Sequence, residues 1–233
     1  MSEQNAQNDR QNKTENGNVL FLILIAVALF AALSYAVTQS SRSSGDGVSK
    51  DTAKLYASQI LQHAASVEQA ITRMRVIDRV PEWGIDFSSS GTSATANASC
   101  TGSHCRIFSD KGGSVAPFVV SGEYRDSGNP TTAMFRIVPV DTVGSSLDDV
   151  MIVYSGVNLA LCEAVNKLAK VTIDLDTIET YGGTIHDYSG TMTSLPSGGG
   201  LIGDQNAALI GRNTGCFQHN SAGYQVFHVV MTR

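Results

Sequence analysis

A run of nineteen residues without a charge, Val19 to Val37, constrains this chain more than any other feature. Within it, only Ser34 and Tyr35 carry polar side-chain atoms. As a helix rising about 1.5 Å per residue, the run reaches roughly the 30 Å of a bilayer's hydrocarbon core. A helix also satisfies its own backbone hydrogen bonds in lipid. The run therefore predicts a transmembrane helix over residues 18–37.

The residues ahead of this run form a polar leader. Residues 1–17 are rich in Asn and Gln and have no apolar pattern that could fold, so we expect them to be disordered. Acidic residues outnumber Arg10 and Lys13 there, unlike the basic start of a secretory signal. The small residues Ser34 and Ala36 offer a site for signal peptidase, so removal of the whole run is the alternative to its retention.

The remainder of the chain divides into a short linker and one domain. Residues 38–49 are rich in Ser and Gly, which weaken a helix, and are expected to form a linker. Residues 50–233 are enough for one domain with its own core. From Lys50 to Met74 apolar residues recur at helical spacing, and this helix should end before Pro81.

Strand-like and helix-like segments then alternate with polar turns. The terminal strand is apolar on both faces and should lie inside the sheet, whereas residues 87–99 read as a surface loop. We expect an α+β fold in which the amphipathic helix packs on an antiparallel β-sheet. The expected strands are 105–108, 116–120, 132–140, 149–154 and 224–232, and a second helix is expected over 159–170.

The sequence carries little that signals catalysis. The formal net charge is −5 and no basic run attracts a polyanion, so no nucleic-acid partner is expected. The glycines from Gly198 to Gly203 do not match a phosphate-binding spacing, and the five histidines are scattered. His186 and Asp187 could join a serine only by spatial coincidence. We expect no enzyme, no cofactor and no metal site.

One acidic cluster could hold a hard cation. Asp174, Asp176 and Glu179 lie close together in the sequence, and calcium takes several carboxylate and carbonyl oxygens. A solvated acidic turn explains the same residues more simply.

Four cysteines, Cys100, Cys105, Cys162 and Cys216, all follow the apolar run. Two disulfides would place this side of the chain in an oxidising compartment. The short loop between Cys100 and Cys105 favours that pair, which leaves Cys162 with Cys216. Buried free thiols are an alternative, as is a metal site with His104 or His219, although no CxxC pair is present. The disulfides would then orient the chain with its N-terminus inside and its domain outside.

This organisation resembles that of type IV pilins and pseudopilins. The resemblance rests on a polar leader ending in Gly17, an apolar helix directly after it, an amphipathic helix, a sheet and a late cysteine pair. It implies cleavage by a prepilin peptidase between Gly17 and Asn18, and assembly with other pilin-like subunits. Most members have glutamate at the fifth mature position, where this chain has Leu22, and the first is commonly phenylalanine. The chain is therefore more similar to minor subunits that lack this glutamate.

The resemblance implies a membrane-anchored structural subunit of a surface filament or a secretion apparatus. Its partners would be the lipid bilayer and other pilin-like subunits. The expected location is a single pass through the inner membrane, with the domain in the periplasm or outside the cell. Two alternatives remain: a bitopic membrane protein whose external domain binds a ligand or partner, and a membrane-tethered enzyme.

Overall fold

The computed structural model describes most of the chain. The described residues are 3–88, 96–126, 133–144, 149–172, 178, 180–182, 185–190, 201–204 and 207–232, and before residue 50 side chains are described only for 19–35. The chain forms two units, Met1–Ser49 and Lys50–Arg233.

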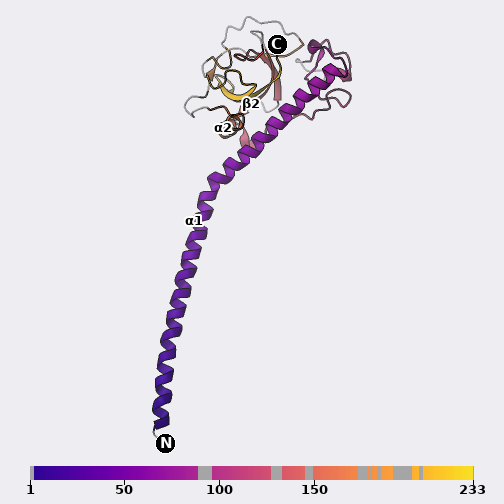
Figure 1. Ribbon diagram of the computed structural model, residues 1–233. Helices are drawn as coiled ribbons and strands as arrows, with labels where there is room; N and C mark the ends of the chain where they lie inside the picture. The colour runs from indigo at the N-terminus through magenta and orange to yellow at the C-terminus, as the bar shows by residue number, and fades with distance from the viewer. Residues whose placement is uncertain are drawn as a thin grey trace. The chain divides into compact units, whose positions relative to one another are not determined.

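A single helix, α1 (Glu3–Val76), runs through the first unit and into the second (Figure 1). It includes residues 3–17, which the sequence predicts to be disordered, and residues 38–49, which it predicts to form a linker. Because a helix propagates at little cost once it is nucleated, the Ser and Gly residues did not end it.

The predicted transmembrane helix over residues 18–37 is wrong. Within the part of the chain that the structure describes, no helix is both long enough and apolar enough to cross a bilayer. The described apolar side chains of α1 run from Val19 to Tyr35, roughly 25 Å of helix against a hydrocarbon core of about 30 Å. The fold class that included this span and the predicted single pass through the inner membrane are corrected with it.

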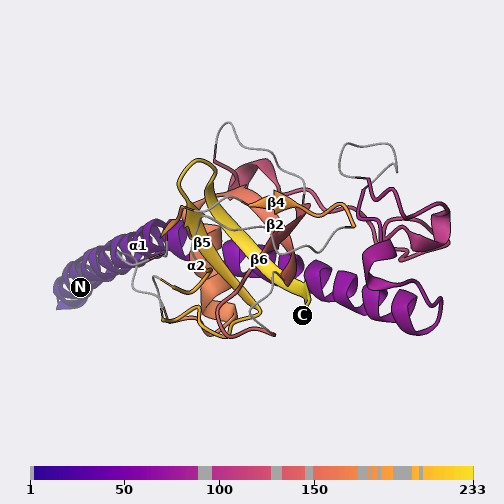
Figure 2. The same ribbon diagram turned by 90° about the horizontal axis from the view of Figure 1, so that it is seen from above.

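The second unit is an α+β domain built around a curled six-stranded sheet in the order β3-β5-β6-β2-β1-β4. The predicted antiparallel sheet is a mixed one, because β3 pairs with β5 in parallel. As predicted, the terminal strand β6 is internal, between β5 and β2 (Figure 2). The strands are β1 (Ala133–Val138), β2 (Asp149–Val157), β3 (Thr180–Tyr181), β4 (His186–Asp187), β5 (Thr214–His219) and β6 (Gly223–Met231).

All nine residues of β2 are buried, because the sheet has a hydrophobic core on each face. Its alternate side chains Val150, Ile152 and Tyr154 share one core with the buried stripe of α1 from Ala53 to Met74. Met151 and Val153 share the second core with Phe217 and Phe227, among others. The amphipathic helix of residues 50–76 thus packs on the sheet as predicted.

The second helix, α2 (Leu159–Leu168), begins at the predicted place because Asn158 accepts a hydrogen bond from the Leu161 backbone N–H. Asn166, only 4% exposed, bonds to both backbone groups of Cys216 and so fixes α2 to β5.

Two predicted strands do not form. Residues 105–108 and 116–120 lie outside the sheet, in a region with three short 3-10 helices, η1 (Glu82–Gly84), η2 (Ser103–Cys105) and η3 (Gly122–Tyr124).

Candidate functional site

Residues Val19 to Tyr35 of α1 form an exposed apolar surface, which we call the apolar segment. Every described side chain in it is exposed, and the large ones range from 40% at Ile25 to 73% at Phe30. Since consecutive residues of a helix point in all directions, the exposed apolar area surrounds the helix. Large continuous apolar surfaces are typical of sites that contact another molecule.

The later part of α1 is fixed to its domain by polar side chains. The Tyr56 hydroxyl donates to the Val119 carbonyl at 3.2 Å and accepts from the Ser121 N–H, and its ring stacks on Tyr124. The Arg73 guanidinium donates to the carbonyls of Gly112 and Gly113 at 2.8 and 2.7 Å. These contacts hold residues 112–124 against the helix.

His63 lies between these two contacts along the helix. Its Nδ1 is 2.6 Å from the hydroxyl of the buried Tyr154, and its Nε2 is 3.0 Å from the carbonyl of Ala116. Because a carbonyl only accepts, Nε2 carries the proton and Nδ1 accepts from Tyr154. Burial lowers the pKa of His63, and the Ala116 carbonyl opposes this effect in part. Burial also raises the pKa of Tyr154 well above its usual range.

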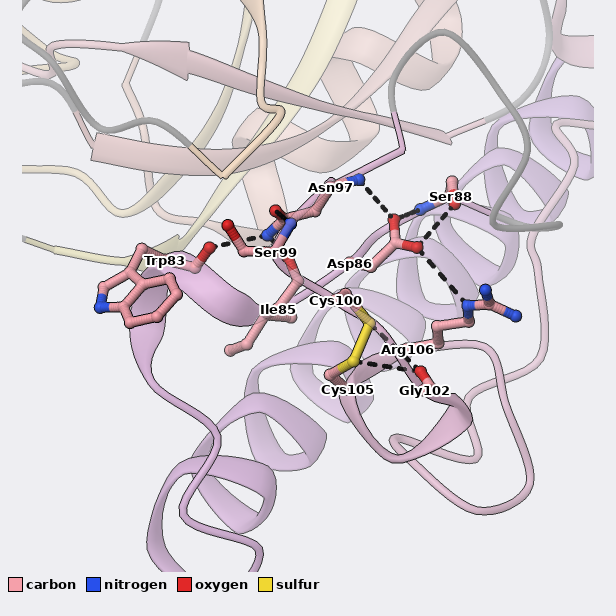
Figure 3. Close-up of a disulfide and its surroundings, with 10 residues drawn as sticks. All are labelled: Trp83, Ile85, Asp86, Ser88, Asn97, Ser99, Cys100, Gly102, Cys105 and Arg106. Carbon is pink, nitrogen blue, oxygen red and sulfur yellow. Dashed lines mark hydrogen bonds and ion pairs between the residues drawn. A yellow bond between two sulfur atoms is a disulfide. The ribbon is translucent and has the colours of Figure 1, made fainter.

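A buried carboxylate, that of Asp86, binds residues on both sides of the Cys100–Cys105 disulfide (Figure 3). Asp86, only 1% exposed, accepts from the N–H and hydroxyl of Ser88 and from the N–H of Asn97, and it faces Arg106 at 3.7 Å. The amide of Asn97 in turn donates to the carbonyls of Trp83 and Ile85. The predicted surface loop of residues 87–99 therefore begins with the buried residues Phe87 and Ser88, and Asn97 near its other end is buried too.

Trp83, the chain's single tryptophan, points away from this network (Figure 3). It is 57% exposed although its backbone carbonyl is bonded to Asn97.

Both disulfides have the pairing that the sequence favours. Cys100 is joined to Cys105, and Cys162 of α2 is joined to Cys216 of β5. The described chain has no free cysteine, so the free-thiol and metal alternatives for these four residues do not apply. Disulfides are typical of oxidising compartments.

The other predicted candidates are not gathered into one site. Gly17 and Asn18 lie within α1. Asp187 forms an ion pair with Arg136 on the adjacent strand β1. Residues 173–177, 179 and 191–200 lie outside the described residues, and these contain Asp174, Asp176, Glu179 and most of the glycine cluster. Among the residues described, no three His, Cys, Asp or Glu side chains could hold a metal ion together.

Sequence reasoning missed one cluster of chemically capable side chains. Thr214 of β5 and His228 of β6 are directly opposite each other, and the Thr214 hydroxyl lies 2.5 Å from His228 Nδ1. His228 Nε2 lies 3.2 Å from a carboxylate oxygen of Glu68 on α1. These residues are 14 and 160 positions apart in the sequence, so no local motif could have revealed them.

Comparisons with family models, characterised proteins and solved structures find no match to this chain.

Proposed function

We propose that this chain is a pilin-like structural subunit that associates through the apolar segment of α1, in a surface filament or a secretion apparatus. One observation carries the proposal: the apolar side chains from Val19 to Tyr35 are all exposed. Burying apolar surface gains about 25 cal/mol per Å². Helices of the same kind from other copies offer the matching surface.

The architecture of the second unit supports the proposal. Residues 53–74 of the same helix contribute to the domain core, so an assembly formed by the apolar segment would carry the folded domain with it. Two disulfides and the polar contacts of α1 hold that domain together.

Substitution of a charge into the apolar segment tests the proposal. Leu24→Glu places a carboxylate at a residue that is 60% exposed in the single chain and becomes buried on association. An unpaired buried charge costs about 3–5 kcal/mol, so the substitution should strongly weaken association. Leu55→Glu is the matched control, since Leu55 is on the same helix, is 67% exposed and lies outside the segment.

Sedimentation of the purified full-length chain measures the result. We expect large species for the wild type and for Leu55→Glu, and small species for Leu24→Glu. A monomeric wild type, or equal assembly of all three proteins, would show that the apolar segment has another role.

Processing belongs to the same proposal. Cleavage between Gly17 and Asn18 by a prepilin peptidase would remove the polar leader and leave the apolar segment directly after the new N-terminus. Mass spectrometry after co-expression with such a peptidase identifies that terminus. An intact Met1 would remove the processing step from the proposal without affecting association.

A ligand- or partner-binding domain is the second candidate. A cleft of about 400 Å³ lies between α1 and residues 113–116, lined by His63, Ser66, Gln69 and Arg73 of the helix. A mostly apolar cleft with a few polar side chains suits a small ligand or a peptide. A screen for ligands that raise the melting temperature, repeated with Gln69→Ala, would distinguish this function from assembly.

A further inference from the structure

We infer that Thr214, His228 and Glu68 form a nucleophilic site that takes an acyl group from a small activated ester. A nucleophile, a base within hydrogen-bond reach of it, and a third group that orients the base are the three parts that such a site requires. Here the hydroxyl-to-imidazole distance is 2.5 Å and the imidazole-to-carboxylate distance is 3.2 Å. This inference does not rest on the proposed assembly function.

The hydrogen bonds assign the roles of the two imidazole nitrogens. A carboxylate accepts but does not donate, so Nε2 of neutral His228 carries the proton and donates it to Glu68. Nδ1 is then the acceptor for the Thr214 hydroxyl proton. Glu68 is a positioning residue, because it holds the imidazole in the tautomer that can act as a base.

A cleft gives the hydroxyl access to a substrate. Thr214 and His228 both line a cleft of about 410 Å³, together with Leu61, Gly211, Arg212 and others. The side chain of His228 is 15% exposed, so it is accessible at this cleft yet held on both sides. The apolar Leu61 suits an acyl chain, and the Arg212 guanidinium suits the negative charge that develops on the ester oxygen.

The reaction needs no reagent other than the ester and water. Thr214 Oγ1 attacks the ester carbonyl while its proton passes to His228 Nδ1, and a carbon–oxygen bond forms. The tetrahedral intermediate then expels the alcohol, which takes the proton back from His228. Thr214 is left as an ester, and a water molecule activated by the same imidazole can release the acid.

Acylation by p-nitrophenyl acetate tests the site in the full-length oxidised chain. Release of nitrophenol and peptide mapping by mass spectrometry together report the rate and the position of the acetyl group. We expect acetylation at Thr214, and its loss in Thr214→Val, which retains the shape of the side chain. Thr214→Ser retains the hydroxyl and should retain the reaction.

Variants of the other two residues separate a catalytic from a merely structural role. His228→Gln should slow acylation about 100-fold or more. Glu68→Gln should slow it less and should alter its pH profile, because the amide no longer fixes the tautomer.

An acetyl group found only on lysines, or an equal rate in Thr214→Val, overturns the inference. Because assembly is measured by sedimentation and depends on other residues, failure of either test leaves the other proposal standing. Circular dichroism of Thr214→Val and Thr214→Ser verifies that both variants are folded.

Discussion

The Tyr154 hydroxyl donates to Nδ1 of His63 at 2.6 Å, which joins the central strand of the sheet to the helix packed on it. His63 can accept this bond only while its imidazole is neutral. Burial lowers the pKa of His63, so the folded chain takes up a proton less readily than the unfolded chain does.

This relationship predicts loss of stability in mild acid. Above about pH 6.5 the imidazole is neutral in both states and the full stability is present. As the pH falls below that value, the unfolded chain binds a proton first, so the free energy of unfolding decreases until the folded chain is protonated too. Urea unfolding between pH 7.5 and 5 measures this decrease.

His63→Gln provides the control for the acid prediction. The glutamine amide does not titrate in this range, so the variant should be less stable at pH 7.5 but lose less stability between pH 7.5 and 5. If the variant and the wild type lose the same amount, another group is responsible.

Replacing Arg73 and replacing Arg75 should change the stability of the chain by different amounts, although the two residues are only two positions apart. Arg73 donates two hydrogen bonds to backbone carbonyls, whereas the side chain of Arg75 is 47% exposed and faces Glu82 at 3.6 Å. Arg73→Ala should cost about 1.5 kcal/mol. Arg75→Ala should cost less than about 0.5 kcal/mol, because exposed ion pairs contribute little. Chemical denaturation measures both, and equal losses would refute the role of the Gly112 and Gly113 carbonyls.

Gly113 is expected to tolerate no side chain. A Cβ there would lie 2.2 Å from the carbonyl oxygen of Ile107, whereas at Gly122 the nearest atom is 3.9 Å away, on the flexible Arg125 side chain. Gly113→Ala should destabilise the chain by about 1–3 kcal/mol because the backbone must move. Gly122→Ala should be neutral or slightly stabilising. Melting temperatures of the two variants decide the matter.

The two disulfides should differ in their contribution to stability. Cys162–Cys216 spans 54 residues and Cys100–Cys105 spans 5. The entropy that a cross-link removes from the unfolded chain grows with loop length, which gives about 4 and 2 kcal/mol respectively. Replacing each pair with alanine and measuring guanidinium unfolding should show the larger loss for the longer loop. A larger loss for Cys100 and Cys105 would mean that the short loop is needed for the fold itself.

Elements with strong local patterns were predictable from the sequence. Asn158 marks the start of α2, and the apolar runs of β2 and β6 are long enough to identify those strands. The helix over residues 50–76 was predictable from the spacing of its apolar residues. The two disulfide pairs follow from the four cysteines and the short loop between the first two.

The remaining features depend on contacts between distant residues. Strand β5 is short and begins Thr-Gly-Cys, so only its pairing with β6 identifies it. Residues 105–108 have strand-like side chains, but Arg106 makes only an isolated bridge to Asp86. The approach of Thr214, His228 and Glu68 requires two strands and a helix, which no sequence window contains.

The continuation of α1 through the predicted linker has another physical cause. Residues 38–49 have weak helix propensity, yet the structure continues α1 through them. Propensity is a preference of each residue, and the helices on both sides extend across this stretch.

The polar contacts of α1 also determine how the domain would carry a mechanical load. Tyr56, His63 and Arg73 each bond to a different part of the domain, and they are spread over about 25 Å of helix. A pull along α1 would therefore be shared among three sets of hydrogen bonds and the apolar stripe between them. A chain built in this way would transmit tension from its helix to its folded domain through many contacts at once, and would not unfold from one end.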